Sequence, residues 1–256
     1  MKKIVLSIAC LAPLVLVAQS DSVLSRVYDW KQPVKTVQKN IETAVLFEGS
    51  TYDMEWLQMN SATLSFSKTA QEMIVPLTEE HLYIVKEGSL TVGINDSVKI
   101  LVPGSIVLLM PGQKFSIKNN KKISCDYYVM KYRSRHSVNL ERGNSSGGSI
   151  VKDWTTIPFK PHDKGGIRNF FQRPTAMTTR MDIHVSTLNP GLKSHEPHTH
   201  RAAEIIVVLD GETEMQVAQN IYKGKKGSVY FLDSYVLHGI RNIGSKPTTY
   251  FAIQLE

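Results

Sequence analysis

The sequence predicts an all-β fold with two similar barrels in tandem. Its 256 residues are enough for one or two domains with a substantial core. From Ile41 onward, short apolar runs alternate with Gly, Asn, Asp or Pro, a pattern typical of strands joined by hairpins. No helical period is sustained between Ile41 and Tyr132. An internal repeat is the third observation, and it indicates that one β unit occurs twice.

The first eighteen residues have the pattern of a secretory signal peptide. Two lysines precede an apolar run from Ile4 to Val17, which ends at Ala18. That run is too short for a membrane-spanning helix, so we predict cleavage after Ala18. A lipoprotein signal at Cys10 is the alternative, but the apolar stretch before it is short. We therefore expect an exported protein, periplasmic or secreted, with no membrane segment once residues 1–18 are removed.

The mature chain is expected to carry a modest positive charge and one cysteine. The formal net charge of +7 falls to about +5 without the two leader lysines. The remaining charges lie in lysine clusters without interleaved aromatic residues, so we expect solvated turns and no nucleic-acid partner. Cys125 cannot form an internal disulfide, and the fold must depend on its core. Its neighbours Ile123 and Tyr127 indicate a buried strand residue.

The chain divides into four segments after the leader. Residues 19–40 are expected to form a polar N-terminal arm, residues 41–138 the first barrel, residues 139–149 a Gly, Ser and Asn-rich linker, and residues 150–256 the second barrel. The expected strands of the first barrel are Ala44–Phe47, Thr63–Phe66, His81–Val85, Leu90–Ile94, Ser105–Met110 and Asp126–Tyr132. Those of the second are Ile167–Phe171, Met181–Leu188, Glu204–Leu209, Thr213–Ala218, Ser228–Leu232 and Thr249–Leu255.

The two barrels repeat at a constant offset of 123 residues. This offset pairs Gly88 with Gly211, Gly104 with Gly227, and Asn119 with Asn242. It also places Ser228–Leu232 on Ser105–Leu109 without a gap. One coincidence of glycines would mean little, but several positions that share one offset indicate a duplicated barrel.

One stretch of the second barrel carries two histidines and a glutamate: His198, His200 and Glu204. Residues two apart on a strand point to the same face, so the two imidazoles are expected to lie together. The next residues of the same parity are apolar and would continue an inner row. His238 lies downstream and completes a set of three imidazoles and one carboxylate. Such a set suits a first-row divalent metal such as Mn, Fe, Ni or Zn.

The spacing of these residues resembles the two motifs of the cupin family. The pattern G-x6-H-x-H-x3-E-x6-G from Gly191 to Gly211 is similar to cupin motif 1, with one extra residue after the first Gly. The segment that ends at Asn242 is similar to motif 2, with Asp233 in place of its Pro and Tyr235 in place of its Gly. The resemblance implies tandem double-stranded β-helix (jelly-roll) barrels. It also implies one divalent metal ion, Mn first with Fe, Ni, Zn or Cu as alternatives, held by His198, His200, Glu204 and His238.

The same offset predicts that the first barrel has no metal site. At the positions of the four expected ligands it has Val75, Leu77, His81 and Phe115. A single histidine on an apolar face is more often a core residue than a ligand. We therefore expect a metal-free first barrel whose cavity is filled by apolar side chains and which supports the second barrel.

Three residues near the expected metal site are candidates for catalysis: His184, Arg180 and Glu196. On the strand Met181–Leu188, Asp182, His184 and Ser186 share one face. That face either lines a polar pocket or points to solvent. Arg180 could bind an anionic substrate, and Glu196 lies in the loop before the ligands, where it could act as an acid or base.

Among two-barrel cupins, the chain resembles the (S)-ureidoglycine aminohydrolase type in length, in its degenerate first barrel and in the segment Thr187–Gly191. The resemblance covers residues 40–256. That group places Glu, His, His and Gln where this chain has the ligands His198, His200, Glu204 and His238. The resemblance therefore implies the architecture and a Mn-type metal, and the aminohydrolase activity only as one candidate.

Three classes of function remain open. The first is a redox-neutral metal enzyme, of hydrolase, isomerase or lyase type, on a small polar substrate such as a sugar acid or ureide. The second is a dioxygenase that uses Fe or Cu. The third is a binding protein for a small ligand without catalysis. A small molecule is the expected partner in each class, and a homo-oligomer is compatible with all three.

Overall fold

The computed structural model describes residues 22–30, 34–35 and 40–256. The predicted signal peptide, residues 1–18, lies outside the described residues, as does part of the predicted arm, residues 19–40. In the part of the chain that the structure describes, no helix is long and apolar enough to cross a membrane.

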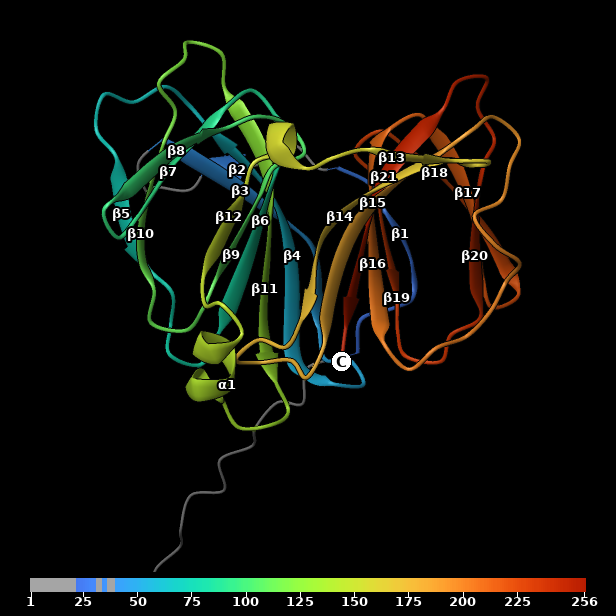
Figure 1. Cartoon of the computed structure of the whole chain (residues 1–256), viewed down its shortest axis with the longest axis horizontal. Coiled ribbons are helices and arrows are strands. Elements are labelled where there is room, and N and C mark those ends of the chain that lie inside the picture. Colours follow the sequence, from blue (N-terminus) through green and yellow to red (C-terminus); the bar gives the residue numbers. More distant parts are fainter. Residues whose placement is uncertain (1–21, 31–33, 36–39) are drawn as a thin grey trace, which may run out of the picture.

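The described chain consists mainly of antiparallel strands, as the sequence predicts (Figure 1). The first half contains β1 (Arg26–Tyr28), β2 (Val34–Lys35), β3 (Ile41–Gly49), β4 (Met54–Leu64), β5 (Gln71–Ile74), β6 (Glu80–Glu87), β7 (Leu90–Ile94), β8 (Ser97–Leu101), β9 (Ile106–Leu109), β10 (Lys114–Lys118) and β11 (Cys125–Ser134). The helix α1 (Leu140–Ser145), β12 (Ile150–Lys152) and the 3-10 turn η1 (Trp154–Thr156) follow. The second half contains β13 (Lys160–His162), β14 (Gly165–Arg173), β15 (Met181–Leu188), β16 (Ala203–Asp210), β17 (Glu212–Val217), β18 (Asn220–Lys225), β19 (Val229–Leu232), β20 (His238–Asn242) and β21 (Thr248–Leu255).

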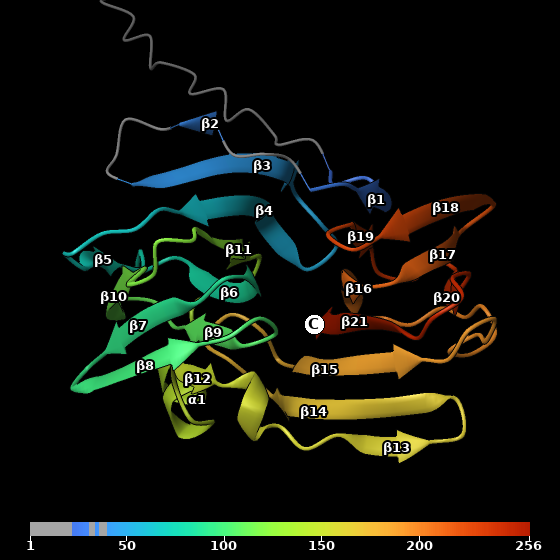
Figure 2. The same ribbon diagram turned by 90° about the horizontal axis from the view of Figure 1, so that it is seen from above.

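Each half closes into a barrel made of one large and one small sheet. In the first barrel, the seven-stranded sheet β12-β9-β6-β11-β4-β3-β2 faces the four-stranded sheet β5-β10-β7-β8. In the second barrel, the seven-stranded sheet β1-β19-β16-β21-β15-β14-β13 faces the three-stranded sheet β18-β17-β20. Figure 2 shows the two large sheets adjacent at the centre of the molecule, with the small sheets on the outside. This arrangement confirms the predicted tandem jelly-roll fold.

The alternation of side chains along each central strand builds three cores. On β16, Ile206 and Val208 point into the second barrel, whereas Ile205 and Val207 point toward the first barrel. This is the period-2 alternation of a strand that is buried on both faces. One apolar cluster lies inside each barrel, and the third lies between the two large sheets. Cys125 belongs to the core of the first barrel, and burial raises the pKa of its thiol to about 12. It is a buried strand residue, as predicted.

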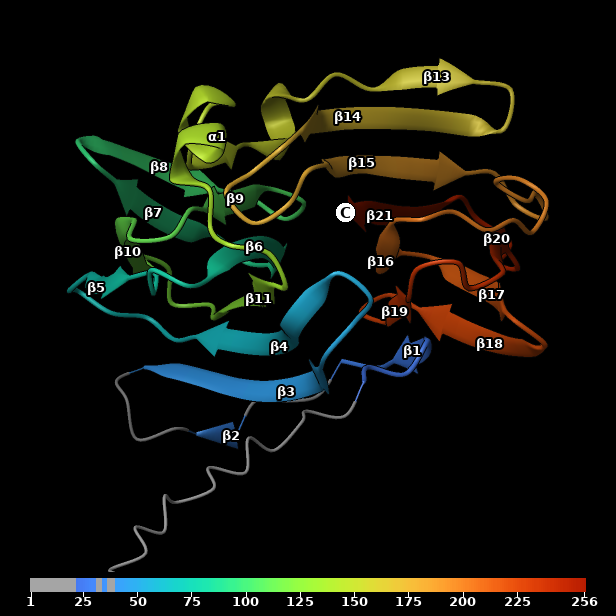
Figure 3. The ribbon, with the colours of Figure 1, turned by 90° about the horizontal axis from the view of Figure 1, so that it is seen from below.

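The two halves exchange strands at the edges of their large sheets. Strand β1, from the predicted arm, pairs with β19 of the second barrel (Figure 3). Strand β12, the first residues of the predicted segment 150–256, pairs with β9 of the first barrel. The predicted boundary therefore does not coincide with the sheets. The helix α1 lies in the predicted linker, where the Asn139 side chain caps it by accepting a hydrogen bond from the Arg142 amide at 2.8 Å.

A buried carboxylate also joins the two halves. Glu80, on β6, is fully buried and accepts hydrogen bonds from the Tyr132 hydroxyl at 2.6 Å, the Thr175 hydroxyl at 2.7 Å and the Ala176 amide at 2.8 Å. Thr175 and Ala176 belong to the loop between β14 and β15. Burial raises the pKa of the Glu80 carboxyl in spite of these donors. Glu80 therefore fixes a second-barrel loop to the first barrel.

We expect Glu80→Ala to lower the free energy of unfolding, by roughly 1–3 kcal/mol for each buried donor left without an acceptor. Since the folded-state pKa of Glu80 is raised, its contribution is largest below the ordinary pKa of about 4.5 and falls as the pH rises through the raised pKa. Denaturant unfolding at pH about 4.5 and about 8 measures both effects. The exposed residue Glu55 provides the matched control, Glu55→Ala, and equal stability of both variants would contradict the role of Glu80.

Candidate metal centre

The four predicted ligands come together at the mouth of the second barrel. His198 lies in the loop between β15 and β16, and its backbone forms two hydrogen bonds with His238, the first residue of β20, at 2.9 and 3.0 Å. Glu204 is the second residue of β16, and His200 lies in the turn before it. Because β20 and the loop are bridged directly, a residue far along the chain completes the site.

The ligand atoms of the three imidazoles lie within 4.8 Å of one another. Glu204 Oε2 lies 3.1 Å from Nε2 of His200 and 3.1 Å from Nε2 of His238. These separations are those of groups that can share one ion, since ligand bonds of about 2.0–2.3 Å place neighbouring ligand atoms about 3–4 Å apart. The structure thus brings together the residues that the sequence singled out.

Backbone carbonyls orient two of the three imidazoles. His200 Nδ1 lies 2.9 Å from the Ala202 carbonyl, and His238 Nδ1 lies 2.8 Å from the Val236 carbonyl. A carbonyl accepts, so each Nδ1 carries a proton, and with a metal ion bound each Nε2 would present its lone pair to the centre. His198 Nδ1 is buried and has no hydrogen-bond partner among the described residues. Three imidazoles, one of which has this unpaired nitrogen, and a carboxylate fit a divalent metal ion.

The charges of the site favour a cation. Burial alone raises the pKa of Glu204, but hydrogen bonds from His200 and His238 outweigh it and bring the pKa to about 2. The same contact with Glu204 raises the pKa of His200. Desolvation and the neighbouring imidazoles lower the pKa of His198. The carboxylate is therefore ionised at neutral pH and faces three nitrogen ligands.

A cavity of about 260 Å³ opens beside these ligands. Its walls combine hydroxyl, imidazole and amide groups with an apolar floor, and the residues are His184, Ser186, Ser194, His195, His198, Glu204, Ile206, Met215, His238, Ile240, Tyr250, Ala252 and Gln254. His184 and Ser186 line this cavity, so the polar face of β15 points into the barrel and not to solvent. The cavity suits a small polar molecule.

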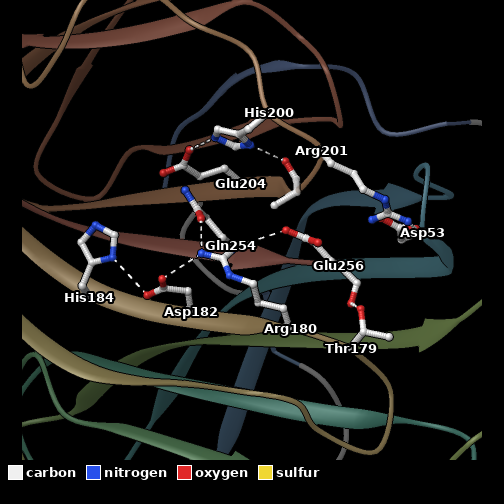
Figure 4. Close-up of polar contacts among 11 residues, drawn as sticks. Asp53, Thr179, Arg180, Asp182, His184, His200, Arg201, Glu204, Gln254 and Glu256 are labelled. Carbon is white, nitrogen blue, oxygen red and sulfur yellow. Dashed lines mark hydrogen bonds and ion pairs between the residues drawn. The ribbon is translucent and has the colours of Figure 1, made fainter.

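Arg180 and His184 are connected through Asp182 (Figure 4). His184 Nδ1 lies 3.3 Å from Asp182 Oδ1, and an Arg180 nitrogen donates to Asp182 Oδ2 at 2.9 Å. The guanidinium also donates to Gln254 at 2.9 Å and Glu256 at 3.2 Å. Arg180 does not line the cavity itself. It holds the carboxylate that orients His184.

Glu196, the third catalytic candidate, lies on the exposed loop before the ligands. Its side chain is 80% exposed, does not line the cavity and forms an ion pair with Lys193 at 3.1 Å. Its neighbour His195 does line the cavity, and its ring centroid lies 4.1 Å from that of His198. The structure therefore separates Glu196 from the metal ligands and His184.

Sequence reasoning missed two lining residues on the last strand, Tyr250 and Gln254. Strand β21 pairs with β15 so that Ser186 lies opposite Tyr250 and Asp182 opposite Gln254. The alternation of side chains along β21 could have identified them, because both residues share the parity of Ala252, which lies opposite His184.

The two departures from cupin motif 2 lie in the turn before β20. Tyr235 has φ 63°, the left-handed conformation that its Gly counterpart favours, so the turn keeps that backbone shape with a tyrosine. The Tyr235 amide donates to the His200 carbonyl at 2.8 Å, and Asp233 accepts a hydrogen bond from the Tyr52 amide at 3.2 Å. The rings of Tyr52 and Tyr235 meet edge to face at 5.8 Å. The first barrel thus supports the turn that carries part of the site.

A buried aspartate of the first barrel also holds the ligand loop. Asp53 lies between β3 and β4 and accepts two hydrogen bonds of 2.9 Å from the Arg201 guanidinium (Figure 4). Arg201 follows His200 directly. A bidentate pair of this kind fixes direction as well as distance. Asp53 therefore positions the backbone next to a predicted ligand.

We expect Asp53→Asn to weaken metal binding by up to about tenfold, because it removes the ion pair that orients the segment next to His200. Chelator competition on the purified protein measures the dissociation constant. Asp96→Asn, at an exposed position of the first barrel, is the control. An unchanged dissociation constant in Asp53→Asn would show that the ion pair between Asp53 and Arg201 has no effect on the site.

The first barrel has no comparable cluster of ligands within the described residues. Strand pairing also corrects the alignment of the repeat: Met73 lies opposite Phe115 as His198 lies opposite His238, so Met73 replaces Val75 as the counterpart of His198. The constant offset fails here because the loop before β6 differs in length from the corresponding segment before β16 in the second barrel. His81, the one possible ligand, contacts Glu79 at 2.9 Å.

The prediction that apolar side chains fill the first barrel is wrong. A cavity of about 920 Å³ opens in it, larger than the cavity beside the metal ligands. Leu77, which was expected to lie inside, is 71% exposed.

Comparison with known proteins agrees with this architecture. Residues 184–254, which include the four ligands and His184, match the family described as Cupin domain. No curated protein sequence matches the chain. Among solved structures, protein Ylba from E. coli is 15% identical with a TM-score of 0.70, and the match covers 94% of this chain and 96% of that one.

Two further structures have the same fold at similarly low identity. AerE from Microcystis aeruginosa is 14% identical with a TM-score of 0.67, over 90% of this chain and 98% of that one. Oxalate decarboxylase of Lactobacillus farciminis, solved as a formate complex, is 13% identical with a TM-score of 0.65, over 92% of this chain and 87% of that one. At such identities the likeness shows the fold alone.

Proposed function

We propose, from the premise that the second barrel is a cupin domain, that this protein is an exported metal-dependent enzyme that catalyses a redox-neutral reaction on a small polar substrate. The observation that carries the proposal is His184, which contacts Asp182 and lines the same cavity as His198, Glu204 and His238. A binding site needs no oriented acid–base group, whereas a hydrolase, isomerase or lyase does. Export rests on the predicted signal peptide.

His198, His200, Glu204 and His238 would hold the metal ion. When bound, the ion supplies a Lewis acid that polarises an oxygen or nitrogen of the substrate. Manganese remains the first expectation, and Fe, Ni, Zn or Cu are compatible with the same ligands. His198, Glu204 and His238 line the cavity, so an ion held by the four ligands would lie beside it and the other lining residues would be free to contact the substrate.

His184 is proposed as the group that moves a proton. Its Nδ1 lies against the Asp182 carboxylate, so Nε2 is the nitrogen left to accept or donate a proton in the cavity. Arg180 neutralises part of the charge of Asp182 and fixes its position. This pairing of imidazole and carboxylate keeps the ring in one tautomer, as in other acid–base sites.

The cavity indicates the class of substrate. About 260 Å³ accommodates a molecule of only a few carbon atoms, and Ser186, Ser194 and Tyr250 place hydroxyls around it. These groups fit hydroxyl, carboxylate or amide substituents, as in a sugar acid or ureide. The similar oxalate decarboxylase acts, by its name, on a small carboxylate, which is compatible with this class.

The test combines the metal content of the purified protein with turnover assays. We expect turnover on a sugar-acid or ureide panel that needs the metal and consumes no oxygen. Oxygen uptake in step with loss of a catechol or flavonol would instead favour the dioxygenase. Full metal content without turnover on any panel would favour a small-ligand-binding protein.

A further inference from the structure

The large cavity of the first barrel has no role in the proposed reaction. About 920 Å³ in volume, it lies inside the barrel that lacks a metal cluster among the described residues. It is lined by residues of six strands: Ile41, Thr43, Val45, Gln58, Asn60, Gln71, Glu72, Met73, Tyr83, Ile117, Tyr127, Val129 and Lys131. Its size exceeds that needed by a metal ion or a single water, and it is large enough for an organic molecule.

Two tyrosines place hydroxyl groups at this cavity without using them in hydrogen bonds to other described residues. Tyr83 and Tyr127 are 6% and 2% exposed, and both line the cavity. Their rings stack with centroids 5.9 Å apart at 26°. Neither hydroxyl forms a hydrogen bond with another described residue, and burial raises the pKa of Tyr83. Neither hydroxyl is among the fully buried atoms without a partner, so water can reach both of them. A ligand that accepts hydrogen bonds could take the place of that water.

The interior of the first barrel also carries the opposite charge to that of the second. Glu204 lies opposite Gln254 across strands β16 and β21, and the corresponding pair in the first barrel is His81 opposite Lys131. Lys131 is half-buried and forms no ion pair with a described carboxylate. A carboxylate that attracts a metal is thus replaced by a side chain that attracts an anion.

Charged and aromatic groups are spaced for one small molecule. Lys131 and Val129 lie on the inner face of β11, and Tyr83 lies opposite Val129. Two residues along a strand span about 7 Å, which is the length of a benzoate-sized acid. A carboxylate at Lys131 would therefore place a flat apolar body against Tyr83. Glu72, the one carboxylate in the described lining, is exposed. Glu79 interacts electrostatically with Lys131 but contacts His81 and does not line the cavity, so Lys131 remains the cationic group of the described lining.

We propose that the first barrel binds a small organic carboxylate with a flat apolar body, without a metal ion. Lys131 and the two tyrosine hydroxyls donate to the carboxylate, and Val129 and Ile117 contact the apolar body. The site is separate from the metal centre and does not depend on the reaction proposed there.

The test is calorimetric titration of the full mature chain with benzoate, and with benzyl alcohol as the neutral analogue. We expect saturable binding of one benzoate and weaker binding of the alcohol. Lys131→Gln introduces the residue found at the equivalent position of the second barrel. It should weaken the binding of benzoate at least about tenfold and change the binding of benzyl alcohol little. The exposed Lys99 provides the control, Lys99→Gln, which should bind as the wild type does.

Two further variants decide the location of binding. Tyr127→Phe removes one hydroxyl and keeps the ring, and it should also weaken benzoate. His238→Ala disrupts the metal centre and should leave benzoate binding intact. Loss of binding in His238→Ala together with wild-type affinity in Lys131→Gln would assign benzoate to the metal centre and overturn the proposal. Benzoate at up to about 10 mM would reveal a Kd of about 1 mM. If folded wild-type protein shows no saturable binding in that range, the proposal is also overturned.

Discussion

Residues 150–256 expressed alone should be insoluble or unfolded, although they contain all four metal ligands. The second large sheet buries its outer face against the first barrel through residues such as Phe231, whose ring lies 5.6 Å from that of Phe47. Truncation exposes this face as an apolar patch much larger than soluble monomers normally carry. It also removes β1, which covers the edge strand β19.

Solubility, size-exclusion profile and circular dichroism of the fragment measure this effect. The predicted mature chain, from residue 19 onward, is the control, because it keeps both β1 and the shared core. A stable, soluble monomer of residues 150–256 with full metal content would show that the first barrel does not support the second.

His184→Ala should slow turnover by roughly 10²–10⁴-fold while the metal content stays unchanged. The reason is the position of His184, which lines the cavity and is oriented by Asp182 but is not one of the clustered imidazoles. Steady-state kinetics and metal analysis on the same preparation provide the measurement. His136→Ala, at an exposed histidine of the first half, is the matched control.

A second variant separates the two acid–base candidates that the sequence offered. Glu196→Gln should retain turnover close to the wild type, because the Glu196 carboxylate points away from the cavity and pairs with Lys193. If Glu196→Gln slowed the reaction and His184→Ala did not, the assignment of the base to His184 would be wrong.

The cluster of candidate metal ligands could be predicted because its signals are local. His198, His200 and Glu204 share one parity over a few residues, and the motif that ends at Asn242 identifies His238. Strand parity also identified His184, although the sequence alone did not show whether its face was inside or outside. The pairing of β15 with β21 decides this.

The support of the site by the first barrel could not be predicted. Asp53 is 148 positions from Arg201, and nothing in the segment Thr51–Asp53 indicates a partner so distant. The exchange of strands between the two halves could not be predicted either, because a three-residue strand such as β1 has too little pattern to indicate its neighbours. The exposed position of the Glu196 side chain could not be predicted either, because a loop, unlike a strand, has no parity that fixes the direction of a side chain.

The cavity in the first barrel shows the limit of predicting a barrel interior from the internal repeat. The offset holds from Gly88 onward, where the chain has no insertion, and fails by two residues at Met73. Positions that align as apolar then lie elsewhere, and Leu77 is exposed where the alignment placed it inside. Similarity between repeats therefore predicts strands better than it predicts what fills a barrel.

Metal stoichiometry is the most direct test of the central claim that the second barrel carries one divalent ion. Elemental analysis after dialysis should give one equivalent per chain for the wild type and for His81→Ala, and essentially none for His238→Ala, which removes a ligand contacting Glu204. His81 and His238 are both buried, so the pair is matched for environment. One full equivalent in His238→Ala, or loss of the ion in His81→Ala, would contradict the account.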